Sequence, residues 1–328
     1  MTVSEYFEAF NQLNVLIVGD VMIDSYLWGK VSRISPEAPV PVVNAEKREN
    51  RLGGAANVAR NIKALGANPI LCAIVGEDED GRILSQLLEE DGMSSEGIIQ
   101  SADRITTVKH RILAGSQQML RLDQEMSHQI SDGESESLIA QLKKIVASKK
   151  IDIIIFEDYD KGVLHENLIQ EIIAFAKEEN IPTTVDPKKR NFLSYGGATL
   201  FKPNLKELME GLNYQPTSDV LADVKSATKA LKNEMNVDSA MITLSEHGVY
   251  ITDFENEYHI PAHRREIADV SGAGDTVISI ASACLALGMS VDKVAEIANL
   301  GGGLVCEHLG VVPIEKDRLE EEATKILG

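Results

Sequence analysis

The segment Asp269-Val-Ser-Gly-Ala-Gly-Asp275 combines residue types that suit phosphoryl transfer. Gly272, Ala273 and Gly274 leave the backbone nearly free of side chains, and an apolar helical stretch follows at once. The first N–H groups of a helix lack intrahelical partners and lie at the positive end of its dipole, so they can hold an anion. Asp275, on the first turn, could take the proton of an acceptor hydroxyl. An isolated GxGD pattern more often marks an ordinary helix start, so this interpretation depends on the rest of the chain.

The composition is typical of a globular protein with a large core. The chain has 328 residues, 44% hydrophobic and 25% charged, which allows a large core. Its formal net charge of −19 argues against nucleic acid or an anionic membrane as a partner. The longest apolar run, within 276–289, is too short to span a bilayer. The 3 cysteines lie far apart in apolar sequence, which indicates buried free thiols in a reducing cytoplasm.

Alternating strand and helix patterns predict an α/β fold with a mostly parallel sheet. Val15–Gly19 is a continuous apolar run that ends in glycine, as a strand buried on both faces should. Polar residues follow the predicted strands, at Asp24, at 157–162 and at 186–190. Ligands of open α/β sheets bind at the carboxyl ends of the strands, so we expect a site there. The alternative for each cluster is a solvated loop, and for Asp24 a turn or a helix cap.

Two stretches without helical periodicity, about 24–45 and 104–124, predict a small β lid outside the main sheet. The first contains prolines and β-branched residues, among them Ile34, Val40, Val42 and Val43. An apolar sheet left uncovered is a liability. We therefore expect a homodimer in which two lids pack face to face.

Two further segments open helices with residues that could hold a ligand. Gly53 and Gly54 allow a ligand to approach the backbone, and Asn57 presents an amide from the first turn. A plain turn is the alternative. Asn204 and Glu207 predict a capping box, while the functional interpretation has Glu207 organise Mg²⁺-bound water.

Segments 53–76 and 269–282 together resemble the two signatures of the ribokinase/PfkB family of sugar kinases. The first matches throughout, and the second departs only at Ile280, where the general pattern has a small residue. Both in the right order are a far stronger signal than either alone. Within the family, about residues 14–310 are most similar to kinases of D-glycero-β-D-manno-heptose 7-phosphate, in the segments SRISPEAPVPVV, RLGGAANVARN, QQMLRLD, EDYDKG, VDPK, KPNLKE, TLSEHG and DVSGAGDTVI. His247 and Lys202 differ from the residues expected there.

The resemblance implies a ribokinase-like three-layer α/β/α sandwich, with residues 1–328 as one kinase domain that includes the lid. In many bacteria this kinase is joined to a C-terminal nucleotidyltransferase with an HxGH motif. The chain contains no HxGH, so we expect the kinase alone. The implied reaction transfers phosphate from ATP to O1 of the heptose 7-phosphate, an early step towards ADP-heptose and lipopolysaccharide core.

The resemblance also implies a role for each group of candidate residues. Asp275 would be the base, with Gly272, Ala273 and Gly274 as the anion hole. Sugar hydroxyls would be held by Asp24, Gly53, Gly54 and Asn57. The nucleotide would be held by Asn204, Leu205, Lys206, Glu207, Ser245 and Gly248, with Glu207 also binding Mg²⁺ through water.

The substrate's 7-phosphate lies at the far end of the sugar from O1, and hence on the lid side. We assign it to Arg33, Lys109 and Arg111, with Lys161 as a weaker candidate, and we assign Lys188 to the ATP phosphates. Two alternatives remain: a related kinase of a pentose, hexose phosphate or nucleoside, and a non-catalytic nucleotide or sugar sensor. Dependence on a phosphorylated acceptor separates the first, and the intact Asp275 argues against the second.

Overall fold

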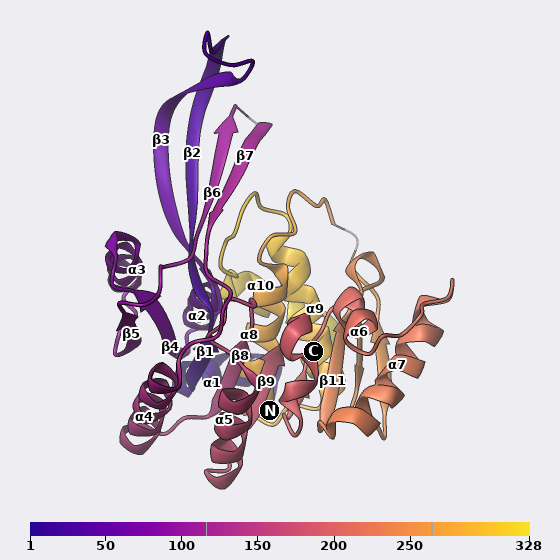
Figure 1. Ribbon diagram of the computed structural model, residues 1–328. Helices are drawn as coiled ribbons and strands as arrows, with labels where there is room; N and C mark the ends of the chain where they lie inside the picture. The colour runs from indigo at the N-terminus through magenta and orange to yellow at the C-terminus, as the bar shows by residue number, and fades with distance from the viewer. Residues whose placement is uncertain (116, 264) are drawn as a thin grey trace.

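Two β-sheets organise the chain (Figure 1), in a computed structural model that describes residues 1–115, 117–263 and 265–328. The larger sheet has the strand order β13-β12-β11-β10-β9-β8-β1-β4-β5. It is parallel from β11 to β5, and β12 runs antiparallel to both β11 and β13. Its strands are β1 (Asn14–Gly19), β4 (Asn68–Gly76), β5 (Gly97–Ser101), β8 (Ile153–Glu157), β9 (Thr183–Asp186), β10 (Leu200–Phe201), β11 (Ser239–Thr243), β12 (Val249–Thr252) and β13 (Glu257–Ile260).

Helices cover both faces of this sheet, and the alternation along β1 shows why. Val15 and Ile17 pack into one core, whereas Leu16 and Val18 pack into the other. The first core is covered by α1 (Val3–Ala9), α2 (Ala55–Ala64), α3 (Glu79–Glu90), α8 (Ala273–Ala286), α9 (Val291–Val305) and α10 (Lys316–Leu327). The second is covered by α4 (Asp132–Ser148), α5 (Glu166–Glu178), α6 (Leu205–Gly211) and α7 (Val220–Met235). The predicted three-layer α/β/α architecture is confirmed.

The smaller sheet has the order β3-β2-β6-β7 and projects from the body as a lid (Figure 1). Its strands are β2 (Val21–Ile34), β3 (Pro41–Gly54), β6 (Val108–Ala114) and β7 (Gln117–Gln124). The lid bounds differ from those expected from the sequence. β3 continues to Gly54, because 51–54 still pair with the foot of β2, and 104–107 lies outside any strand.

The two faces of the lid differ in chemistry. Leu27, Ile112 and Leu120 are cross-strand partners and share one face, and Leu122 lies two positions from Leu120 on the same face. Leu120 and Leu122 are 55% and 56% exposed. We call these four residues the apolar lid face. The opposite face carries Asp24, which pairs with Arg111.

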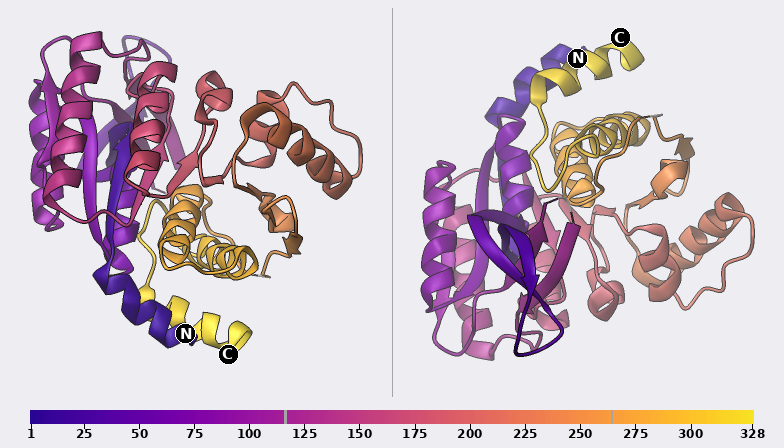
Figure 2. Two further views of the ribbon diagram at one scale, coloured as in Figure 1. Left: turned by 90° about the horizontal axis from the view of Figure 1, so that it is seen from below. Right: turned by 90° about the horizontal axis from the view of Figure 1, so that it is seen from above.

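The carboxyl ends of the parallel strands place several polar residues at one edge. Asp20 follows β1, Glu157 and Asp186 end β8 and β9, and Asn204 lies just beyond β10. The amino end of α8 lies at the same edge, since Asp275 is close to Glu157 and Asp186. The first and last helices of the chain, α1 and α10, lie side by side (Figure 2). Ser4 donates a 2.6 Å hydrogen bond to Glu320 between them. Among the residues described, no helix is long and apolar enough to cross a membrane.

Candidate active site

Asp275 is a buried carboxylate held by two neutral donors. Its Oδ2 accepts a 2.7 Å hydrogen bond from Asn57 Nδ2, and its Oδ1 accepts a 2.8 Å bond from the Tyr159 hydroxyl. Burial raises the pKa of Asp275 to about 6, an effect that these two hydrogen bonds oppose and the charge of Asp186 reinforces. The side chain can therefore be ionised near neutral pH and still accept a proton.

The turn before Asp275 requires glycine. Gly272 is the N-cap of α8 and has φ 79°, a left-handed conformation. A Cβ there would lie 3.2 Å from Asn57 Nδ2, so a side chain would also crowd the residue that holds Asp275. The first N–H groups of α8 remain suited to an anion. One N–H group of the predicted anion hole is already used: that of Ala273 donates to the Val270 carbonyl at 3.3 Å.

Two further carboxylates lie beside Asp275. Oxygens of Glu157, Asp186 and Asp275 lie within 4.8 Å of one another. Lys202 Nζ pairs with Asp186 at 2.8 Å, whereas both oxygens of the fully buried Glu157 have no hydrogen-bond partner in the described part of the chain. Burial, and then the charges of Asp186 and Asp275, raise the pKa of Glu157 well above its ordinary value. Unpartnered carboxylate oxygens beside Asp186 fit a divalent cation such as Mg²⁺, which prefers oxygen ligands.

Glu207, the metal ligand expected from the sequence, is engaged elsewhere. Its Oε1 pairs with Lys188 at 2.7 Å, and its Oε2 accepts the Asn204 N–H at 2.9 Å. Asn204 Oδ1 in turn accepts the Glu207 N–H at 2.8 Å, which completes the predicted capping box. Lys188, Asn204 and Glu207 are therefore brought together, as expected for one end of a nucleotide site.

Three of the remaining predicted nucleotide residues, Leu205, Lys206 and Ser245, line a cavity of about 830 Å³ beside Asn204, whereas Gly248 does not. Ser245 belongs to the turn between β11 and β12, where Gly248 has φ 86°. A Cβ on Gly248 would lie 2.0 Å from a backbone oxygen of the neighbouring strand, so the turn needs glycine.

The loop after β8 is fixed by a residue that the sequence analysis did not select. Asp20, which alone separates β1 from β2, accepts backbone hydrogen bonds from Tyr159, Lys161 and Val163 at 2.9, 3.0 and 3.1 Å. Burial and the charge of Asp158 raise the pKa of Asp20 to about 6. These three hydrogen bonds to Asp20 fix the position from which Tyr159 reaches Asp275. The segment EDYDKG was recognised as a strand-end cluster, but nothing local indicated which side chain would reach the base.

On the acceptor side, Asp24 lies against Gly53, where a Cβ would sit 2.5 Å from Asp24 Oδ2. Arg111 pairs with Asp24. Lys109 Nζ lies 3.4 Å from Asp123 and 3.2 Å from Glu125, and Lys161 Nζ lies 2.9 Å from Glu125. We call this set the lid ion cluster: Asp24, Lys109, Arg111, Asp123, Glu125 and Lys161.

Arg33 does not belong to the lid ion cluster, which corrects one expectation. Arg111 is opposite Tyr26 on β2, whereas Arg33 pairs with Val42 near the tip of the lid. At about 3.3 Å per residue, the intervening strand separates them by roughly 20 Å. A strand this long cannot present residues from its foot and its tip to one phosphate within a single chain.

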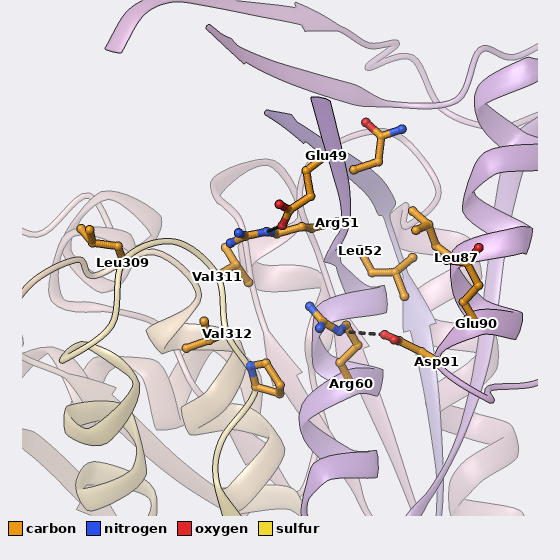
Figure 3. A pocket seen from close by; sticks show the side chains of 12 residues that line it. Glu49, Arg51, Leu52, Arg60, Leu87, Glu90, Asp91, Leu309, Val311 and Val312 are labelled. Atoms are coloured by element: carbon orange, nitrogen blue, oxygen red, sulfur yellow. Dashed lines mark hydrogen bonds and ion pairs between the residues drawn. The ribbon is translucent and has the colours of Figure 1, made fainter. Parts of the chain in front are cut away.

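A separate cavity of about 340 Å³ lies beside β3, α2 and the loop 309–313 (Figure 3). Its two arginines are already paired: Arg51 Nε lies 2.6 Å from Glu49, and Arg60 Nε lies 2.9 Å from Asp91. Both arginines of this cavity therefore face neighbouring carboxylates.

Comparison with known proteins places this geometry in context. Residues 12–317 match the description "pfkB family carbohydrate kinase". The chain is 39% identical to the bifunctional protein HldE of Syntrophotalea carbinolica over 97% of its own length and 64% of that protein. It is 41% identical to the protein of the same name in Methylobacillus flagellatus, over 94% of this chain and 62% of that protein. The chain thus spans less than two thirds of the length of these relatives.

Solved structures show the same fold at lower identity. Phosphofructokinase-2 from Escherichia coli in complex with potassium superposes with a TM-score of 0.80 and 20% identity, covering 96% of this chain and 99% of that one. Arabidopsis thaliana ribokinase complexed with ribose and ATP gives a TM-score of 0.70 and 15% identity, covering 95% and 99%.

Proposed function

The chain belongs to the pfkB family of carbohydrate kinases, and on that premise we propose that it phosphorylates O1 of D-glycero-D-manno-heptose 7-phosphate with ATP. The observation that carries the proposal is the buried Asp275, held by Asn57 and Tyr159 at the amino end of α8. The acceptor is supported by the heptose-kinase segments of the sequence and by the similarity to HldE proteins. The product is heptose 1,7-bisphosphate, a precursor of ADP-heptose.

In the reaction, Asp275 accepts the proton of the O1 hydroxyl as O1 forms a bond to the γ-phosphorus of ATP. The bond from phosphorus to the β–γ bridging oxygen breaks, and ADP leaves with the electron pair. The N–H groups at the start of α8 stabilise the charge on the transferred phosphoryl group. Tyr159 and Asn57 keep the carboxylate aimed at the cleft in the meantime.

ATP binds beside Lys188, Asn204 and Ser245, together with Mg²⁺. Asp186 and Glu157 are the residues suited to hold the ion, with Glu207 acting on Lys188 and on α6. When bound, Mg²⁺ neutralises charge on the phosphate oxygens. Lys202 Nζ pairs with Asp186 at 2.8 Å and holds that carboxylate in place.

The sugar lies between Asp275 and the lid. Asp24, Gly53, Gly54 and Asn57 contact its hydroxyls, and its remote phosphate meets Lys109, Arg111 and Lys161. Arg33 is excluded from this set by its distance along β2.

We also propose that the two sheets work as one kinase unit and that the protein is a cytoplasmic homodimer. The apolar lid face supports the dimer, because Leu120 and Leu122 would be buried against the same residues of a second copy. The 3 buried free cysteines support a reducing compartment.

A kinase assay against a panel of acceptors tests the function: heptose 7-phosphate, fructose 6-phosphate, ribose and adenosine, with the product anomer read by NMR. We expect heptose 7-phosphate to give the highest kcat/KM and a new phosphate at O1. Preference for an unphosphorylated acceptor would indicate a different kinase of the family, and ATP binding without any transfer would indicate a sensor.

A further inference from the structure

We propose that the Glu125 carboxylate occupies, in the free protein, the place that the remote phosphate of the acceptor takes when the substrate binds. The inference rests on the proposed function, because it requires a phosphorylated acceptor. It adds a residue and an exchange of anions that the heptose kinase reaction does not itself imply.

Glu125 is bound in the way a phosphate would be. Its Oε1 pairs with Lys161 Nζ at 2.9 Å and its Oε2 with Lys109 Nζ at 3.2 Å, so each carboxylate oxygen meets a different ammonium group. The two lysines come from different parts of the molecule: Lys109 from β6 of the lid, and Lys161 from the loop fixed by Asp20. An anion at this point joins the lid to the loop that carries Tyr159.

The other carboxylates of the cluster are held more firmly. Asp24 is 4% exposed and pairs with Arg111 against Gly53. Asp123 is gripped by Arg121 through two bonds, Nε to Oδ1 at 2.8 Å and Nη2 to Oδ2 at 2.6 Å. Among the residues that the structure describes, Glu125 has only the two lysines as partners, and it lies one residue beyond the end of β7. It is therefore the carboxylate that can leave without disturbing a strand.

Like-charge repulsion favours such a departure. Glu125 faces the two ammonium groups of Lys109 and Lys161, whereas Asp123 has Arg121 as well as Lys109. Partial burial raises the pKa of Glu125, but hydrogen bonds from Lys161 and Lys109 outweigh it, and its pKa is lowered. A phosphate dianion entering beside an ionised Glu125 would meet a like charge. If it displaces Glu125, it takes over both ammonium groups.

Only a phosphorylated acceptor takes part in this exchange. A sugar without the remote phosphate has no group that can compete with Glu125 for the lysines, so the carboxylate stays paired. Glu125 thus imposes a displacement cost that only phosphorylated acceptors meet.

Replacement of Glu125 by glutamine tests the inference, since Gln keeps the size and removes the charge. KM for heptose 7-phosphate should fall by about 3- to 10-fold, because a salt-bridged competitor has been lost. KM for ATP should stay the same. Inhibition by inorganic phosphate, competitive with the sugar, should strengthen by a similar factor. The matched control is Glu46→Gln, which removes the same charge from a lysine pair on the lid, outside the cluster.

The outcomes separate this inference from the proposed function. No turnover of heptose 7-phosphate by the wild-type protein refutes the function, and phosphate binding by Glu125→Gln then decides the inference alone. An unchanged or raised KM in Glu125→Gln, or an equal fall in Glu46→Gln, overturns the inference while leaving the function intact. If Glu125→Gln folds poorly, Lys161→Met provides the second variant. It should raise KM for the phosphosugar and weaken phosphate inhibition, and no change in either would also overturn the inference.

Discussion

Asp275 and Glu157, at the proposed base, and the carboxylates at the foot of the lid have opposite kinds of partner. Asp275 is held by the neutral donors Asn57 and Tyr159, and Glu157 has no hydrogen-bond partner among the described residues. In the lid ion cluster every carboxylate meets a cation, as Asp123 does with Arg121. The pKa values follow: burial raises that of Asp275, whereas hydrogen bonds from Arg121 lower that of Asp123 despite partial burial.

The difference separates two tasks within one cleft. A base has to exchange a proton near neutral pH, so it benefits from burial without a cationic partner. A binding region has to keep its charges at every working pH, and ion pairs do that. Changes at the first region should therefore alter kcat, and changes at the second should alter KM for the sugar.

The largest effect is expected for Asp275→Asn, which keeps the size of the side chain and removes proton acceptance. The kcat should fall by about 10²–10⁴-fold with little change in ATP binding. Steady-state kinetics and nucleotide titration measure both. Asp132→Asn, on the exposed first turn of α4, is the control. A variant that keeps more than a tenth of wild-type kcat would remove Asp275 from the role of base.

The opposite region is tested by Lys109→Met. Loss of one charged contact should raise KM for the phosphosugar by about 10- to 100-fold, while KM for ATP stays constant. Lys30→Met, which breaks the exposed pair with Glu46, serves as the control. If KM for ATP rises instead and KM for the phosphosugar does not, ATP and the sugar bind at the opposite ends of the cleft from those proposed.

A smaller effect on kcat is expected for Tyr159→Phe, about tenfold, because one hydrogen bond to a charged group is lost. The pH profile is more specific. Asp275 must be ionised to act, so wild-type kcat/KM should fall as the pH drops through about 6. The Tyr159 hydrogen bond favours the ionised form, so its removal should move this limb to higher pH. Tyr258→Phe, on an exposed strand, should leave the limb in place.

The smallest change concerns assembly, a twofold difference in mass. Sedimentation of the wild-type protein should show about twice the 35.8 kDa chain mass. Leu122→Lys places a charge on the apolar lid face and should yield monomers, whereas Ile326→Lys on α10 should not. A wild-type protein that sediments as an active monomer at micromolar concentration argues against the dimer.

Local patterns predicted the frame of the site well. The buried-strand pattern of β1 and the helix start at Gly272 depend on neighbouring residues, and both were predicted from the sequence. The capping box of Asn204 and Glu207 is likewise local. The resemblance assigned Asn57 to the sugar hydroxyls and Asp275 to the base, but it did not predict the hydrogen bond between them, which spans 218 residues.

What the sequence did not predict is set by tertiary geometry. Tyr159 and Glu157 stand among other polar residues in a strand-end segment. Only the packed sheet reveals that these two, and not their neighbours, lie beside Asp275. Glu125 follows a strand in a stretch without periodicity, so its two lysine partners cannot be read locally. Arg33 was grouped with Lys109 because both are basic and near the lid, but the length of β2 separates them.

The attachment of the lid makes it a mechanical lever. The 14-residue strand β2 leaves the main sheet through Asp20 alone, and β3 returns to α2 at Gly54, whose φ of 59° marks a sharp bend. At about 3.3 Å per residue, the arm is roughly 40 Å long. Rotation of the arm about these two pivots by about 10° would swing the tip by roughly 7 Å while moving Asp24 by only about 2 Å. A spectroscopic probe at the tip would thus report an ångström-scale shift at the foot of the lid as a displacement several times larger.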